Sequence, residues 1–462
     1  MYKKILLSKI DLWDLYKKKE WDQPSFILDS SGYDAELGRY SIVGWDPYSM
    51  LRSRGNIVEH FENDEWLVSN MNPLEALEEL CNDINKSMIN LPDLDLPFWG
   101  GLVGYISYDM KNNIEKLTRK CDDDLGIYEQ YWGVYDCFII QDHLENLIYL
   151  LGHNKERFDK MTKEFFELLS ACDKERSKIT TKNFRSNFTK EDYLESILKV
   201  KDHIRKGNVY QVNLSQRFAF EMVGDPLDFY DILRKLNPAS FGGVLNFAEM
   251  SILSISPERY IKIDGRVIET RPIKGTRKRG MSIEEDELLK NELRESCKDQ
   301  AELLMIVDLE RNDLGRICIP GSIKVENIFA VKEHATLFHL DAVVKGKLRN
   351  EITIGDVLKH TFPGGSITGA PKIMAMNIIE SLEPTARGIY TGSIGHIDCR
   401  GNCDLNIAIR TLVIKDYTAY YQAGGGLVSD SDPELEYEET MIKSRALFMA
   451  LEEVNLADIT RR

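Results

Sequence analysis

The stretch Phe98-Trp-Gly-Gly-Leu-Val-Gly-Tyr-Ile-Ser-Tyr108 sets three glycines among aromatic and branched side chains. Glycine has no Cβ, so this pattern is typical of a bent, buried strand that another backbone approaches closely. Further short strand-like runs lie at residues 26–29, 40–43, 56–61, 132–141 and 147–151. Turn-forming residues separate these runs. The sequence therefore predicts that the first 170 residues mix short strands with helices, and one helix is predicted over residues 73–90.

After residue 170 the chain becomes polar and charged, and residues 171–188 are predicted to form a linker. Thr189, with Asp192 three residues on, is expected to cap a helix that ends at Gly207. A strand from Val209 should follow. Beyond it, helices and strand-like runs alternate without the regular strand–helix units of a doubly wound fold, so the residues predict a large α+β body.

The composition narrows the class of partner. The chain has 462 residues, a formal net charge of −16 and a pI near 5.2. These values argue against nucleic acid or an anionic membrane as the main partner. No run approaches the roughly 18 apolar residues that span a bilayer. The close cysteine pair, Cys399 and Cys403, lacks a second pair at metal-binding spacing, so a cytoplasmic protein with reduced thiols is expected.

A basic stretch, Glu269-Thr-Arg-Pro-Ile-Lys-Gly-Thr-Arg-Lys-Arg-Gly280, interrupts this acidic chain. Its five cations are Arg271, Lys274, Arg277, Lys278 and Arg279. Such a stretch is typical either of a solvated basic loop or of a site for a small anion. Lys274 lies between Pro272 and Gly275, on backbone that should not be helical. Its cationic neighbours are expected to lower the pKa of its ammonium group and to favour the nucleophilic free amine.

Two predicted helices each carry a pair of acids three residues apart. The pairs are Asp299 with Glu302, and Glu436 with Glu439. This spacing puts both acids of a pair on one helix face. Two such faces turned inward would form a carboxylate cage for Mg²⁺, whereas two solvated faces would have no such role. Ser431 and Glu434 are expected to form a capping box at the start of the second helix.

Two glycine-rich stretches are candidates for close contact with a ligand. Phe362-Pro-Gly-Gly-Ser-Ile-Thr-Gly-Ala-Pro-Lys372 leads into a helix predicted over 373–382, whose free backbone amides would suit an anion. ATP is excluded, because Ala370-Pro371 stands where a P-loop requires Lys followed by Ser or Thr. The second stretch is Gln422-Ala-Gly-Gly-Gly-Leu-Val428, for which a plain turn is the alternative.

Three single residues have both a catalytic and a structural interpretation. Glu258 suits a general acid if it is desolvated, or an ion-paired surface residue if it is not. His339 is typical of a hydrogen-bonded core histidine rather than a catalyst. Arg410 lies in an apolar run predicted to be a strand, where its guanidinium needs a carboxylate from the protein or from a ligand.

Taken in order, these segments resemble the chorismate-utilising enzymes: the large subunits of anthranilate synthase and aminodeoxychorismate synthase, isochorismate synthases and salicylate synthases. Besides the stretches already quoted, the resemblance is carried by Tyr210-Gln-Val-Asn-Leu-Ser215, Ser256-Pro-Glu-Arg259, Leu304-Met-Ile-Val-Asp-Leu309, Arg311-Asn-Asp-Leu-Gly-Arg316, Tyr390-Thr-Gly-Ser-Ile-Gly395 and Ala423-Gly-Gly-Gly-Leu-Val-Ser-Asp-Ser-Asp-Pro433. It implies a two-layer, β-sandwich-like α+β body with flanking helices. It also implies an N-terminal subdomain (1–170) as the candidate tryptophan pocket and glutaminase contact, a linker (171–188) and a chorismate-binding catalytic domain (189–455).

The resemblance also assigns expected roles to individual residues. Lys274 would attack C2 of the chorismate ring while Glu258 protonates the departing C4 hydroxyl. Mg²⁺ would be held by Glu302 and Glu439, with support from Asp299 and Glu436. The residues expected to bind the substrate are Arg410, Tyr390, Gly424, Gly426, Thr368, His339 and Gln211. The usual family motif His-Leu-Val-Ser reads His339-Leu-Asp-Ala342 here, which puts the role of His339 in question.

Two positions favour one branch of this family. Members that add water to chorismate carry a lysine where this chain has Gln211, and anthranilate synthases usually carry an alanine where it has Lys274. Glutamine with lysine is the pattern of aminodeoxychorismate synthases, which aminate C4 and retain the pyruvyl group. The ammonia would come from a separate glutaminase subunit. An anthranilate synthase is the alternative, and a non-catalytic subunit that binds chorismate or tryptophan is the third reading.

Overall fold

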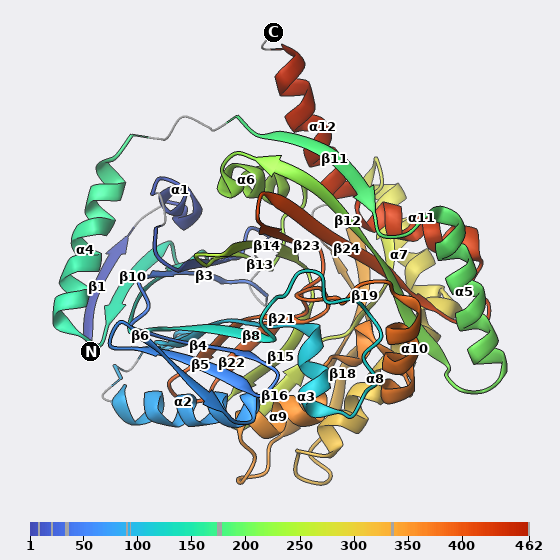
Figure 1. Cartoon of the computed structure of the whole chain (residues 1–462), viewed down its shortest axis with the longest axis horizontal. Coiled ribbons are helices and arrows are strands. Elements are labelled where there is room, and N and C mark those ends of the chain that lie inside the picture. The colour runs from blue at the N-terminus through green and yellow to red at the C-terminus, as the bar shows by residue number, and fades with distance from the viewer. Residues whose placement is uncertain are drawn as a thin grey trace.

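Two large sheets, stacked face to face, form the centre of the computed structural model (Figure 1), which describes residues 1–7, 10–19, 22–32, 37–88, 91–92, 94–172, 178–333 and 337–460. In spatial order the first sheet contains β1 (Tyr2–Leu7), β10 (Leu147–Gly152), β9 (Cys137–Asp142), β3 (Tyr40–Trp45), β2 (Ser25–Asp29), β13 (Phe241–Asn246), β14 (Met250–Ser256), β23 (Thr411–Lys415), β24 (Thr418–Leu427), β12 (Gln211–Val223) and β11 (Thr180–Ser186), with β20 (Gly369–Ala370) paired to β12. The second contains β17 (Ile273–Lys278), β19 (Leu337–Lys347), β16 (Val267–Thr270), β15 (Arg259–Asp264), β22 (Cys403–Asn406), β21 (Ser393–Asp398), β7 (Gly101–Ile106), β8 (Gln130–Tyr135), β4 (Ser49–Arg54), β5 (Ile57–Glu62) and β6 (Glu65–Asn70), with β18 (Lys324–Glu333) paired to β19. The predicted two-layer α+β fold is confirmed.

Helices cover the outer faces and one end of the two sheets (Figure 1). Those packed on the outer face of the first sheet are α1 (Leu12–Tyr16), α4 (Lys155–Ser170), α6 (Pro226–Leu236) and α12 (Arg445–Thr460). Beside the second sheet lie α2 (Pro73–Ser87), η1 (Tyr108–Met110), α3 (Lys111–Ile114), α7 (Ile283–Glu295), α8 (Cys297–Gly315) and α9 (Ile354–Thr361). Around β12 and β24 lie α5 (Lys190–Arg205), η2 (Gly365–Ile367), α10 (Lys372–Leu382) and α11 (Pro433–Lys443).

Strands of the first sheet are buried on both faces. On β2, Phe26 points into the core between the sheets, and its neighbour Ile27 points into the core under the outer helices. On β3, Ile42 and Val43 divide in the same way. This follows from the two-residue period of a strand, because successive side chains point to opposite faces. A strand buried on both faces needs a continuous run of apolar residues, and the sequence has such runs at β2 and β3.

The glycine-rich stretch around residue 100 forms β7, in the interior of the second sheet between β21 and β8. A Cβ on Gly104 would lie 2.0 Å from the carbonyl oxygen of Tyr131, and one on Gly101 would lie 2.4 Å from that of Ile397. Neither position can accept a side chain without moving a backbone. The predicted close approach of another backbone is confirmed on both sides of the strand.

The two halves of the sequence share both sheets. In the first sheet β2 pairs with β13, and in the second β7 pairs with β21. Residues 180–186, in the segment expected to be a linker, form β11 on the edge of β12, and residues 173–177 of that segment lie outside the described residues. The proposed division into 1–170, 171–188 and 189–455 stays a prediction. Thr189 caps α5 as predicted, accepting a hydrogen bond from the Asp192 amide at 3.1 Å.

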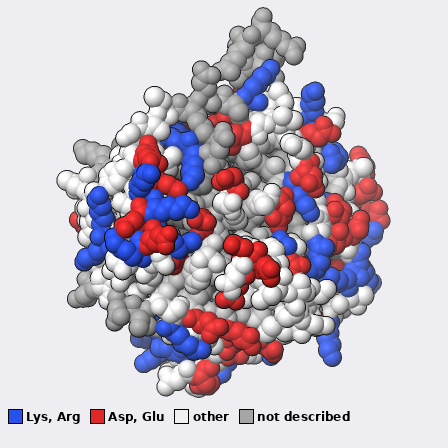
Figure 2. Space-filling model, turned by 60° about the vertical axis from the view of Figure 1, so that its left-hand side comes forward, with Lys and Arg blue, Asp and Glu red and all other residues white. Residues whose placement is uncertain are grey.

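The surface carries charges of both signs. Acidic and basic side chains are interspersed over the face seen in Figure 2, so the negative net charge is not gathered into one field on that face. None of the helices within the described ranges is long and apolar enough to cross a membrane.

Candidate active site

Lys274 lies on β17, at the edge of the second sheet nearest α8 and α7. The ladder between β17 and β19 slips at this point, and Gly275 adopts a left-handed φ of +65°. The bulge turns the Lys274 side chain inward, where its Nζ donates a hydrogen bond to the Ser366 carbonyl oxygen at 3.2 Å. The prediction of non-helical backbone around this lysine is confirmed.

The half-buried Lys274 and the buried Glu258 interact electrostatically. Burial lowers the pKa of the Lys274 ammonium group, and the Glu258 carboxylate opposes this effect. Burial also raises the pKa of the Glu258 carboxyl, with Lys274 acting in the opposite direction. Glu258 is only 6% exposed and its Oε1 accepts no hydrogen bond from the described residues. Both shifts are toward the free amine and the protonated acid, the forms that a nucleophile and a general acid use.

The expected cause of the lowered Lys274 pKa was wrong. The neighbouring arginines form ion pairs of their own: Arg271 with Glu269 at 2.6 Å, Arg277 with Glu292 at 2.8 Å and with Asp299 at 3.2 Å, and Arg279 with Asp286 at 2.9 Å. Their charges are thereby offset by acids. Burial is the main cause, and the cation that adds to it is Lys443.

Lys443, near the end of α11, was missed by the sequence analysis. Its Nζ donates to Glu439 at 2.7 Å and to the Gly424 carbonyl oxygen at 3.0 Å. Its positive charge acts to lower the pKa of both Lys274 and Glu258. The signal was present in the sequence, because a lysine four residues after Glu439 lies on the same helix face.

The two acid pairs approach each other from α8 and α11. Burial raises the pKa of Glu302, and the Asp299 and Glu439 carboxylates raise it further. On α11, Glu436 and Glu439 lie above the strand β24. A Cβ on Gly425 would be 3.1 Å from Oε2 of Glu436 and 3.8 Å from Oε1 of Glu439. Glu436 is buried and Glu439 is half-exposed, so the two acids of this pair are only partly turned toward α8.

The donor set suits a hard divalent cation. Burial raises the pKa of Glu436, and the nearby Glu439 carboxylate adds to the increase, so a cation would relieve repulsion among these oxygens. Within the described ranges, no three His, Cys, Asp or Glu side chains form a ready ligand cluster. Lys443 neutralises Glu439, and Arg277 neutralises Asp299. Rotation of these side chains would be needed to bind a metal.

The start of α11 differs from the prediction. The N-cap is Asp432, whose Oδ1 accepts from the Glu434 amide at 3.0 Å and from the Leu435 amide at 3.1 Å. The predicted capping box of Ser431 and Glu434 is wrong. Ser431 Oγ instead donates to Oε1 of Glu436 at 2.6 Å, which fixes one of the predicted metal ligands.

The glycine-rich turn before α10 already holds a carboxylate of the protein. The Gly365 amide donates to Oε1 of Glu310 at 3.1 Å, so this amide is not free for a ligand. Thr368 is fully buried, and its Oγ1 donates to the Gly364 carbonyl oxygen at 3.1 Å. Its own carbonyl accepts from the Asn213 amide at 2.8 Å, which ties the turn to β12.

Arg410 lies in the turn between β22 and β23 with a left-handed φ of +49°, rather than inside a strand as predicted. Within the described part of the chain, no carboxylate oxygen lies within 4.0 Å of it. Its Nη1 donates to the Asn237 Oδ1 at 3.4 Å, a long contact. Burial lowers the pKa of Arg410, and Glu258 is close enough to oppose that effect. A half-buried guanidinium that has no carboxylate partner among the described residues is suited to an anionic ligand.

The remaining predicted substrate-binding residues lie around the same cluster. Gly424 and Gly426 stand on β24 opposite Ser215 and Asn213 of β12. The Gln211 side chain covers Gly426, where a Cβ would be 2.6 Å from its Nε2.

Tyr390 is buried, and the Arg387 guanidinium lies 5.6 Å from its ring centre. Burial raises the pKa of Tyr390. His339 shares its Nδ1 between the Thr276 hydroxyl and the Gly275 carbonyl oxygen, each at 3.1 Å, so it is a bonded core histidine next to the Lys274 bulge.

A buried network behind the site was not predicted. Glu383 accepts from the Ser215 amide at 2.9 Å and forms an ion pair with Arg387 at 2.8 Å. Arg387 donates in turn to the carbonyl oxygens of Asn213 at 2.6 Å and Ile367 at 3.1 Å. One ion pair therefore fixes β12 and the η2 turn relative to each other.

Residues from both halves of the sequence border a cavity between the sheets. Ser30 Oγ donates to the Ser240 carbonyl oxygen at 3.2 Å, and both residues line this cavity of about 330 Å³. Arg259, Lys262 and Phe241 also line it. The cavity is separate from the Lys274 cluster.

Comparison with known proteins finds similarity along almost the whole chain. The sequence profile of a family described as chorismate binding enzyme matches residues 23–449. Anthranilate synthase component 1 of Aquifex aeolicus is 39% identical over 94% of this chain and 91% of its own. Aminodeoxychorismate synthase component 1 is 36% identical in Bacillus subtilis (97% of this chain, 96% of its own) and in Escherichia coli (97% and 98%).

Among solved structures, anthranilate synthase component I from Streptococcus pneumoniae superposes with a TM-score of 0.79 at 32% identity, covering 89% of this chain and 93% of its own. The isochorismate synthase MenF of Escherichia coli has a TM-score of 0.72 at 16% identity, covering 97% and 95%. The second likeness concerns the fold alone.

Proposed function

Because this chain belongs to the family of chorismate-binding enzymes, we propose that it acts as component I of an aminodeoxychorismate synthase. The observation that carries the proposal is Lys274, whose buried amine has a lowered pKa beside Glu258. Anthranilate synthases usually have an alanine at this position. Gln211, where relatives that add water have a lysine, supports the same branch.

In the proposed reaction the Lys274 lone pair attacks C2 of chorismate. Both ring double bonds shift, and the C4 hydroxyl leaves as water with the proton from Glu258, whose carboxylate then takes the proton that Nζ loses. Ammonia attacks C4 and loses a proton, and both double bonds shift back. The C2–Nζ bond breaks as Glu258 returns a proton to Nζ, which releases 4-amino-4-deoxychorismate. The covalent intermediate has the mass of chorismate less water, and pyruvate is not lost.

Other side chains would hold the substrate. The Arg410 guanidinium and the Tyr390 hydroxyl would bind the enolpyruvyl carboxylate, with the amides of Gly424 and Gly426. Thr368 and His339 would border the ring. Glu302 and Glu439, supported by Asp299 and Glu436, would hold Mg²⁺, which as a Lewis acid would screen the charge of the ring carboxylate. Ammonia would be supplied by a separate glutaminase subunit, and tryptophan is a further candidate ligand.

The proposal is tested by the product formed from chorismate, Mg²⁺ and ammonium. We expect a product that 4-amino-4-deoxychorismate lyase converts to 4-aminobenzoate. Lys274→Ala should lower kcat by about 10²-fold or more, since it removes the nucleophile. Lys278→Ala is a matched control, because this lysine is exposed on the same strand. In rapid-quench mass spectrometry, only chains with Lys274 should carry the adduct.

Anthranilate synthase component I is the second candidate, because relatives of that activity are as similar to this chain as the aminodeoxychorismate synthases are. It requires Lys274 to have no covalent role. Release of pyruvate together with anthranilate, and a Lys274→Ala variant of nearly normal rate, would establish that activity and contradict the proposal. Chorismate binding without turnover by the folded protein would point to the non-catalytic subunit.

A further inference from the structure

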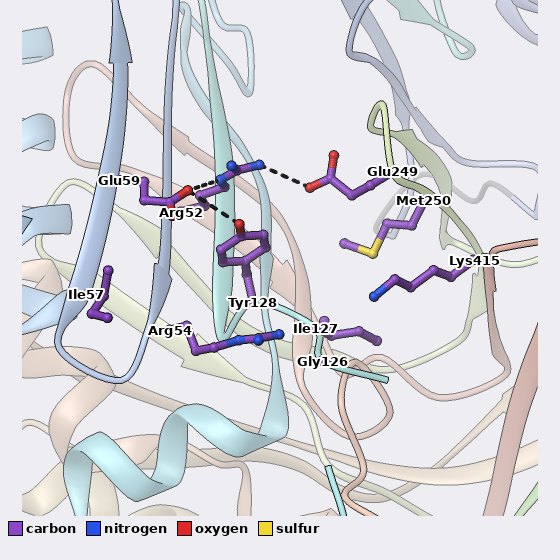
Figure 3. Close-up of a pocket in the computed structure, with 10 residues that line it drawn as sticks. All are labelled: Arg52, Arg54, Ile57, Glu59, Gly126, Ile127, Tyr128, Glu249, Met250 and Lys415. Carbon is purple, nitrogen blue, oxygen red and sulfur yellow. Dashed lines mark hydrogen bonds and ion pairs between the residues drawn. The ribbon is translucent and has the colours of Figure 1, made fainter. Parts of the chain in front are cut away.

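A second cavity, of about 480 Å³, shares no lining residue with the Lys274 cluster or the Ser30 cavity. Figure 3 shows its lining side chains. It is open to solvent and lies between strand ends of the first sheet and the β4–β5 hairpin of the second. The β4–β5 hairpin and the 126–128 loop form one side. The start of β14 and the end of β23 form the other. Its size is that of sites for small organic molecules.

The charges of this cavity are unevenly paired. Arg52 binds both of its carboxylates, with Nε 2.5 Å from Glu59 and Nη1 3.3 Å from Glu249. Two cations remain, Arg54 and Lys415. In the described part of the chain, neither has a carboxylate oxygen within the 4.0 Å of an ion pair. Both extend their charged ends toward the middle of the cavity from opposite sides (Figure 3).

The two cations are held in place by backbone rather than by acids. Lys415 Nζ donates to the Leu125 carbonyl oxygen at 2.5 Å, which leaves two ammonium protons for another acceptor. The Arg54 guanidinium lies against Gly126, where a Cβ would be 2.9 Å from its Nη2. Gly126 also has a left-handed φ of +55°, so the loop is shaped to admit this guanidinium.

The acids Asp123 and Asp124, next to this loop, have partners other than Arg54 and Lys415. Asp123 accepts a hydrogen bond from the Gly126 amide at 3.1 Å, and Asp124 forms an ion pair with Arg217. Neither acid forms an ion pair with Arg54 or Lys415. In a chain of net charge −16, an inward-facing pair of uncompensated cations is suited to an anion.

Apolar and aromatic side chains complete the lining. Ile127 and Met250 are buried in its wall, Ile57 borders it, and the Tyr128 ring lies between the two arginines (Figure 3). We propose that this cavity binds a small organic carboxylate, with its carboxylate between Arg54 and Lys415 and its apolar part against Tyr128 and Ile127. Such a ligand would link the two sheets at a site distinct from the candidate active site.

The test is calorimetric titration of the full chain with benzoate, with benzamide as the uncharged probe of the same shape and inorganic phosphate as the anion without an apolar part. An Arg410→Gln background removes the cation proposed to bind carboxylate at the active site, so its result does not depend on the proposed function. We expect benzoate to bind in this background. Benzamide and phosphate should bind about tenfold more weakly or not at all.

Variants locate the binding. Arg54→Gln and Lys415→Gln, each in the Arg410→Gln background, should weaken benzoate binding by about tenfold or more. Lys86→Gln, an equal change of charge on the exposed face of α2, should leave it unchanged. An unfolding temperature within about 2 °C of the parent protein's establishes that a variant keeps the parent's fold. Absence of benzoate binding, phosphate binding as tight as benzoate, or binding unaffected by either cavity variant would overturn the proposal.

Discussion

The charge states of the Lys274 amine and the Glu258 carboxyl depend on each other. Each loses hydration in its charged form, and the attraction between the two charges regains only part of that loss. Burial therefore shifts the pKa of each group in the direction of its neutral form. A pair arranged in this way can deliver a nucleophile and a proton in the same step without first separating two charges.

Glu258→Gln tests this coupling. The amide cannot protonate a leaving hydroxyl, so we expect kcat to fall by about 10²- to 10⁴-fold. Because the Glu258 charge opposes the lowering of the Lys274 pKa, that pKa should fall further in the variant. The pH dependence of Lys274 acetylation, followed by mass spectrometry with exposed Lys278 as internal reference, measures the change. Identical Lys274 profiles in both proteins would contradict the coupling.

At this scale the sequence predicted which residue types the site contains, but not how each one is oriented. Lys274, Glu258, Glu302 and Glu439 do come together electrostatically. The arginines beside Lys274 could not be placed, because the bulge at Gly275 breaks the alternation of the strand and the acids that bind them lie on α7 and α8. Such pairing is a tertiary contact, which a local pattern does not contain.

At the scale of elements, α8 joins two parts of the site. Asp299 and Glu302 lie near its start, and Glu310, two to three turns later, binds the Gly365 amide of the η2 turn. The acid spacing was predictable from the helical period. The role of Glu310 was not, because the turn seemed ready for an external anion and nothing in its composition indicates that a distant helix supplies the carboxylate.

Glu310→Gln tests the energetics of this contact. Burial raises the pKa of Glu310 to about 7, against an ordinary 4.5. The folded state therefore binds this proton more tightly than the unfolded state. Its contribution to stability is complete below pH 4.5 and is lost as the pH rises through 7, by about 3 kcal/mol at most. Between pH 5 and 8, urea unfolding should show a smaller loss of stability in the variant than in the wild type.

Asp308→Asn is the matched control for that measurement, because Asp308 is an exposed acid on the same helix, 75% exposed at its side chain. It should keep the pH dependence of the wild type. An equal loss of stability in the wild type and in Glu310→Gln would show that the Glu310 proton does not distinguish the folded from the unfolded state.

For the whole molecule, the fold class was predictable but the distribution of strands was not. Alternating apolar residues identify a strand without identifying its neighbour. The pairs β2–β13 and β7–β21 join residues more than 200 positions apart. The sequence therefore suggests two consecutive units, whereas each sheet contains strands from both.

This interleaving predicts that neither half folds alone. Residues 1–172 expressed separately lack β13 and β21, so the edges of β2 and β7 would be exposed together with the core between the sheets. We expect separate 1–172 and 178–462 chains to lack near-ultraviolet circular dichroism and cooperative unfolding, and the intact chain to unfold in one calorimetric transition. Mixing the two fragments during refolding should restore the signal. Cooperative unfolding of the isolated 1–172 chain would instead establish the N-terminal part as an independent domain.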